Sequence, residues 1–190
     1  MDSRKLKRTT IYWLHRFFTR RVFQLPKQIL QLGYIYLILT RSRSRPFRGI
    51  ELIACLPYQV DSLSEIIAAL DLLQRSDPRR FRRVENYIKW VLLGNFKPLG
   101  FYSSVGQVCG LRKMSRESSD LFALCGYASV LVHEGTHALL DALRFAPTKA
   151  TKDRIERLCI REQSRFLARF PAVRANVSRV FDRIAKTKLR

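Results

Sequence analysis

Two histidines four residues apart, with a glutamate directly after the first, have the residue types and spacing best suited to chemistry in this chain. The run reads His133-Glu134-Gly135-Thr136-His137. On a helix, residues four apart lie on one face, a turn apart, so both imidazoles can point toward one metal ion. Zinc accepts imidazole nitrogen at about 2.0–2.1 Å in a tetrahedral arrangement. The spacing therefore predicts a zinc (Zn2+) site on a helix.

Glu134 is placed to act at such a site without binding the ion. It follows the first histidine and lies to one side of the pair, where its carboxylate can take a proton from a water activated by the metal. We therefore expect Glu134 to be the general base of a hydrolytic reaction. The competing interpretation is that both histidines lie on a core helix and only make hydrogen bonds within the protein. That arrangement would bury two imidazoles and a carboxylate together without a function for them.

A third protein ligand is needed, and two carboxylates in the following helix are candidates. Glu156 comes nineteen residues after His137, which suits a short loop and an antiparallel return. Glu162 falls in the apolar stripe of the same helix, so it too could face inward. We prefer Glu156 as the metal ligand. The other glutamate would then support the site through hydrogen bonds or pair with an arginine.

Asp141 lies one turn beyond His137 on the same helix face. Two roles stay open for it. It could accept a hydrogen bond from a ligand histidine or from a nearby arginine. It could equally face solvent at the end of the helix.

The stretch of residues 133–141, H-E-G-T-H-A-L-L-D, resembles the active-site helix of the thermolysin-type zincins, or gluzincins. It is also similar to bacterial metallopeptidase-like proteins whose helix reads V-H-E-x-T-H-A and is followed by an R-I-E-x-x-C-like run. Residues 154–159 of this chain read R-I-E-R-L-C. The likeness covers roughly residues 120–171. It implies a zincin-like domain that binds zinc and hydrolyses a peptide or protein substrate.

The resemblance also bears on the third ligand. Gluzincin ligands often stand in an E-x-x-small pattern, in which the small residue lets two helices approach closely. Glu156 followed by Cys159 has that form, whereas Glu162 is followed at the same spacing by the bulky Arg165. This chain departs from the thermolysin pattern at Ile160, where that pattern has an acid.

The departures make the metal site a firmer expectation than the peptidase activity. No histidine downstream can serve as an oxyanion partner, and Tyr102 and Tyr127 are the candidate electrophilic helpers. Two other function classes stay open. One is a non-catalytic zincin-like domain that uses zinc for structure or partner binding, and the other is a basic protein that binds nucleic acid or a membrane surface.

The elements that must position these residues follow from the pattern along the chain. Residues 50–56 are apolar and predict a strand. Phe101-Tyr102 and Val108-Cys109 predict a hairpin around Gly106. Helices are expected at 66–73 after a capping box at Ser62 and Glu65, from Pro78 after Asp77, from residues 118–120 to about 143, at 150–169, and from Pro171. The expected class is α+β, mostly helical, with a small sheet beside the zinc helix.

The charge is uneven along the chain. The net charge is +21, and residues 1–50 and 151–190 hold most of it, whereas residues 51–150 are almost neutral. Residues 1–45 are expected to be a basic amphipathic helical arm and linker, and residues 46–190 the zincin-like domain. The arm could bind an anionic membrane surface, bind nucleic acid, or pack on the domain.

The remaining composition bounds the location. Four cysteines stand far apart with no C-x-x-C pair, which argues against a cysteine zinc site and against a disulfide framework and favours reduced thiols. The sequence has no clean secretory signal and no apolar run long enough to span a bilayer. The expectation is a cytoplasmic protein, with peripheral association at the membrane through its arm as an open alternative. The oligomeric state stays open.

Overall fold

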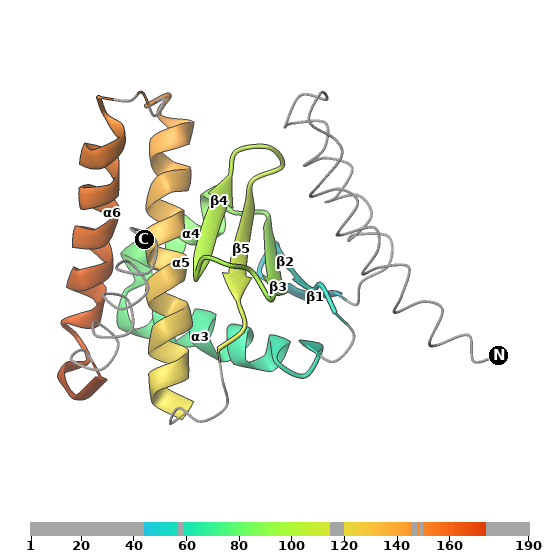
Figure 1. Cartoon of the computed structure of the whole chain (residues 1–190). Helices are drawn as coiled ribbons and strands as arrows, with labels where there is room; N and C mark the ends of the chain where they lie inside the picture. Colours follow the sequence, from blue (N-terminus) through green and yellow to red (C-terminus); the bar gives the residue numbers. More distant parts are fainter. Residues whose placement is uncertain (1–43, 57–58, 115–119, 146–147, 149, 174–190) are drawn as a thin grey trace. The chain divides into compact units, whose positions relative to one another are not determined.

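The computed structural model describes residues 44–56, 59–114, 120–145, 148 and 150–173. The predicted basic arm and the first part of the predicted linker lie outside these residues. The elements along the chain are β1 (Ser44–Phe47), β2 (Ile50–Ala54), α3 (Leu63–Ser76), α4 (Pro78–Tyr87), β3 (Trp90–Gly94), β4 (Gly100–Ser103), β5 (Val108–Arg112), α5 (Asp120–Ala142) and α6 (Lys152–Leu167) (Figure 1).

Five strands form one mixed sheet in the order β1-β2-β3-β5-β4. The three central strands are parallel, and the two edge strands, β1 and β4, each pair antiparallel with their neighbour. Because β2 and β3 are parallel, the chain must cross over between them, and α3 and α4 make that crossover. The mixture of helices and sheet is consistent with the expected α+β class.

The first strand corrects the predicted linker. Ser44, Arg45 and Pro46 were expected in an irregular boundary segment, but with Phe47 they form β1 and pair with β2. An edge strand needs no buried face and tolerates proline, so neither the polar residues nor Pro46 excludes a strand here. A two-residue turn joins the strands, with Arg48 at φ 48° and the next residue, a glycine, at φ 82°.

The middle of the sheet holds a strand that the sequence did not predict. Trp90–Gly94 lies between β2 and β5, and four of its five residues are buried. A strand covered on both faces has a continuous apolar run instead of an alternating pattern, which removes the usual signal. The predicted strand at 50–56 and the predicted hairpin are confirmed as β2 and as β4 with β5.

The helix starts are of two kinds. Asp77 caps α4 as predicted, because its side chain accepts a hydrogen bond from the Arg80 amide and Pro78 takes the first helical position. The predicted capping box at α3 is wrong. Ser62 has helical backbone angles and makes no side-chain cap, and the Ser64 hydroxyl bonds the Asp61 carbonyl instead.

The long helix α5 is the centre of the domain. It packs against α3, α4 and α6, and it also contacts β4 and β5 at the edge of the sheet (Figure 1). Gly135 allows the close approach to α4, since an added Cβ would lie 2.9 Å from a methyl group of Val84. Among the described residues, no helix has the length and apolar character needed to cross a membrane.

Candidate metal centre

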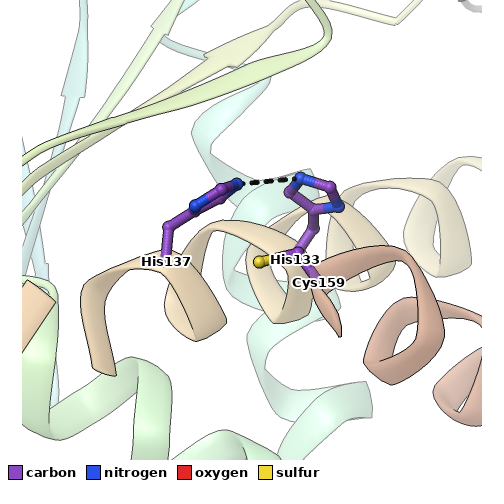
Figure 2. A group of neighbouring side chains, drawn as sticks. All are labelled: His133, His137 and Cys159. Carbon is purple, nitrogen blue, oxygen red and sulfur yellow. Dashed lines mark hydrogen bonds between the residues drawn. The ribbon is translucent and has the colours of Figure 1, made fainter. Parts of the chain in front are cut away.

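Helix α5 brings the two histidines of the motif together. The Nε2 atoms of His133 and His137 lie 3.2 Å apart, and the rings are tilted toward one another (Figure 2). The apolar residues before the motif are buried, which fixes the helix face that carries the rings. The side chains themselves are only 15% and 25% exposed. Two imidazole nitrogens therefore converge on one point near the surface.

Helix α6 returns alongside α5 and places Glu156 at the same point. One carboxylate oxygen lies 3.0 Å from His137 Nε2, and the other lies 3.6 Å from His133 Nε2. The Glu156 side chain is 52% exposed, so the cluster opens toward solvent on this side. The preference for Glu156 in the sequence analysis assumed this arrangement, in which the next helix returns antiparallel after a short loop.

The contacts of this cluster change the proton affinity of its members. Hydrogen bonds from His133 and His137 hold the pKa of Glu156 well below its usual range, against the opposing effect of burial. Burial lowers the pKa of His137, but the hydrogen bond to Glu156 and the charges of Glu134 and Glu156 outweigh it, so the pKa is raised.

Cys159 is a further candidate donor, although the spacing of the cysteines in the sequence argued against a cysteine zinc site. Its Sγ lies within 4.8 Å of a ring nitrogen of each histidine. It stands one turn after Glu156 on α6, and it is fully buried. Burial, followed by the charges of Glu156 and Glu134, raises the pKa of the thiol to about 12. The sequence identified Cys159 only as a small residue at the helix contact.

Gln163 orients the first histidine. Its Oε1 lies 3.2 Å from His133 Nδ1, and its Nε2 donates to the Ser129 hydroxyl at 3.4 Å. Because the amide oxygen can only accept, this contact favours a proton on Nδ1 of His133, which makes Nε2, the atom that contacts His137 and Glu156, the nitrogen that would bind a metal. Sequence reasoning missed Gln163, although its position one turn after Cys159 on the buried face of α6 is a signal for it.

Glu134 lies on the sheet side of the histidine pair. Its side chain is buried, and its carboxylate faces β4, where a Cβ added at Gly100 would come within 2.9 Å of Oε1. The same added atom would lie 2.4 Å from Val130, so glycine at this position lets β4 approach α5 closely. The charge of Glu134 also raises the pKa of His137, so the Glu134 carboxylate lies close enough to act electrostatically on the cluster.

The structure places Glu162 away from the histidines. One of its carboxylate oxygens lies 3.1 Å from Arg80 and 3.4 Å from Arg83, and the other lies 2.9 Å from Arg165. Arg83 also donates to the Thr136 hydroxyl at 3.0 Å, so this cluster joins α4, α5 and α6. Glu162 therefore has the arginine-partner role expected for the glutamate that does not bind the metal.

Asp141 and the two tyrosines have different surroundings. Asp141 is exposed at the end of α5, which is the second of its two expected roles, and it accepts a long hydrogen bond of 3.5 Å from the Tyr102 hydroxyl. Burial and the Asp141 charge raise the pKa of Tyr102 to about 12, so its hydroxyl remains a proton donor. Tyr127 is fully buried, and its oxygen accepts from the Met114 amide at 2.8 Å. That contact gives Tyr127 a structural role.

The donor set fits a zinc ion. With bonds of about 2.0–2.1 Å, two ligand atoms of a tetrahedral ion lie about 3.3 Å apart, close to the separations of 3.0–3.6 Å among the nitrogen and oxygen atoms here. Nitrogen, carboxylate oxygen and sulfur are all ligands that zinc accepts. Comparison of the chain with protein-family models, with curated proteins and with solved structures gave no match.

Proposed function

We propose that this chain is a zincin-like, zinc-dependent peptidase whose metal is held by His133, His137 and Glu156. The observation that carries the proposal is the convergence of the two histidine Nε2 atoms, 3.2 Å apart, with the Glu156 carboxylate, whose two oxygens lie 3.0 Å and 3.6 Å from them. The hydrogen bond from His133 to Gln163 supports it, because that contact leaves Nε2 free to bind. A bound zinc ion would supply a Lewis acid and lower the pKa of a water toward about 7.

The protein groups around the metal have separate roles in this proposal. Glu134 lies beside the pair His133 and His137 but not between their ring nitrogens. It takes the proton of the attacking water and passes it to the leaving amine. Glu156 is half exposed and faces the side from which a substrate can enter. Strand β4 is at the edge of the sheet and contacts α5, so an extended peptide could pair with its outer edge beside the site.

A non-catalytic zinc site is the second candidate, and Cys159 is the observation that favours it. A structural zinc has four protein ligands, whereas a catalytic one keeps a position for water or substrate. His133, His137, Glu156 and Cys159 together would make four. The basic arm expected to bind membrane or nucleic acid lies outside the described residues and stays a prediction. The free thiols support a reducing, cytoplasmic location.

The test compares the purified chain with its Glu134→Gln variant. We expect about one zinc per chain in both proteins, measured by elemental analysis after gel filtration. The parent should cleave an unfolded protein, and the variant should lose this activity by about 100-fold or more, because the general base is gone. Zinc without cleavage in the parent would favour the non-catalytic candidate, and a folded parent without zinc would refute both.

A further inference from the structure

The side chain of Cys159 distinguishes two kinds of metal site that share the same histidines. It comes from α6 and lies beside His133 and His137 (Figure 2). Glu156, one turn earlier on the same helix, also contacts both histidines. The sulfur is within 4.8 Å of both histidines. A tetrahedral ion would hold sulfur and nitrogen about 3.6 Å apart. The required movement is therefore about an ångström at most.

We infer that Cys159 is a fourth protein donor, and that the resting metal site is a closed shell of two nitrogens, one oxygen and one sulfur. This rests on the proposed zinc site and deepens it. The charges support it: one carboxylate and one thiolate neutralise a divalent cation, which favours binding in a partly buried position. Bound metal would replace the thiol proton, as it does at other cysteine sites.

The two donors from α6 differ in their freedom to leave the metal. Cys159 is fully buried at the contact between α5 and α6, whereas the Glu156 side chain is 52% exposed. A buried side chain on a helix is held by its packing, and an exposed carboxylate can rotate into water. Glu156 is therefore the exchangeable donor, and the coordination position that it vacates is the one that a substrate would use.

Cobalt(II) provides the test, because a thiolate ligand gives the bound ion a sulfur-to-metal charge-transfer absorption in the near ultraviolet. The full chain loaded with one cobalt should show this band. Cys159→Ala and Cys159→Ser should each lose it while still binding cobalt through the remaining side chains. Serine has nearly the same volume as cysteine. If the band were lost in Cys159→Ala only because packing is weakened, it would remain in Cys159→Ser. Cys125→Ala, on the buried face of α5, is the matched control and should keep the band.

Each result decides the inference. Cobalt bound by the parent without the band, or a band that persists in both Cys159 variants, would overturn the sulfur ligand and leave the proposed function intact. Glu156→Ala at saturating cobalt should keep the band, and its loss would overturn the assignment of Cys159 as the fixed donor. A folded parent that takes up neither cobalt nor zinc would refute the proposed function as well, so the two failures are distinguishable.

Discussion

At the scale of single residues, the two candidate glutamates have opposite surroundings. Glu156 faces two imidazoles, and Glu162 faces three guanidinium groups. Replacing a metal ligand by alanine and replacing a remote ion-pair partner by alanine should therefore have different effects on zinc affinity. Their separation also explains how α6 can carry two inward-facing carboxylates without placing like charges together: about two turns of helix lie between them.

We predict that Glu156→Ala lowers zinc affinity by more than the about 10–100-fold typical of groups outside the ligand shell. Glu162→Ala should leave the affinity within about tenfold of the parent, because its contacts reach the motif only through Arg83 and Thr136. Competition with a chelator at one fixed pH measures both. A larger loss in Glu162→Ala than in Glu156→Ala would reverse the ligand assignment.

Gln163 should matter for zinc although it cannot bind it. Gln163→Leu removes the acceptor for His133 Nδ1–H, so we expect zinc affinity to fall by about 10–100-fold. Gln163→Glu restores an acceptor and should recover most of that loss, which separates orientation of the ring from simple packing. The same chelator competition applies. Equal affinities in Gln163→Leu and the parent would show that the hydrogen bond does not orient the ligand.

The residues of the site were predictable to the extent that they share one helix. The i, i+4 spacing of His133 and His137 determines their geometry within α5 and needs no tertiary information. The preference for Glu156 added one assumption, an antiparallel return of the next helix. Gln163 and Cys159 could not be assigned in this way, because their roles depend on how far α6 is rotated and shifted against α5.

At the scale of elements, the cluster around Glu162 connects three helices behind the metal site. Arg80 and Arg83 come from α4, Glu162 from α6 and Thr136 from α5. The Glu162 side chain is 12% exposed, and the side chains of Arg80 and Arg83 are 12% and 14% exposed. Removing one member of a shielded ion-pair cluster leaves the opposite charges without compensation, which costs more than the pair contributed.

We therefore predict that Glu162→Gln lowers the free energy of unfolding by about 3 kcal/mol at pH 7, measured by urea denaturation with a chelator present. The loss should shrink on acidification. Burial raises the pKa of Glu162, but Arg80, Arg165 and Arg83 outweigh it, so the pKa in the folded protein lies below that of a glutamate in the unfolded chain. A carboxyl with a lowered pKa stabilises the fold above its unfolded pKa, and this contribution is lost as the pH falls through the folded value.

A matched control for this experiment comes from α4 itself. Glu85→Gln removes a carboxylate from the same helix outside the cluster, and a change of this kind is expected to stay within about 0.5 kcal/mol. Glu162→Gln and Glu85→Gln should converge in stability as the pH falls below about 4.5. Equal stabilities at pH 7 would contradict a structural role for the ion pairs.

The elements themselves were predicted unevenly, for physical reasons. Helix α5 was predicted almost to its observed end, because a long apolar segment with a helical period is a strong signal. Asp77 and Pro78 predicted the start of α4 from local geometry alone. Strands β1 and β3 were missed, because a polar edge strand and a fully covered central strand both lack the alternation by which strands are recognised.

At the scale of the whole molecule, the basic N-terminal segment and the candidate metal site occupy different parts of the chain. The site lies on α5 and α6, and residues 1–43, which are strongly basic, are outside the described structure. Within the described part of the chain, the buried core runs from Ile50 in β2 to Val173. If the arm serves only to bind an anionic partner, its removal should leave folding and metal binding unchanged.

The structure moves the boundary for that experiment. A cut after residue 45 would remove half of β1, whereas a cut after residue 43 keeps all four residues that pair with β2. We predict that residues 44–190 form a folded protein with one zinc per chain and nearly the parent's thermal midpoint. Residues 50–190 lack β1 and expose the edge of β2, so this shorter chain should melt at a lower temperature and aggregate more readily. Zinc analysis and thermal unfolding followed by circular dichroism measure both. If residues 44–190 are insoluble or free of metal while the full chain is not, the arm belongs to the fold and is no separate binding segment.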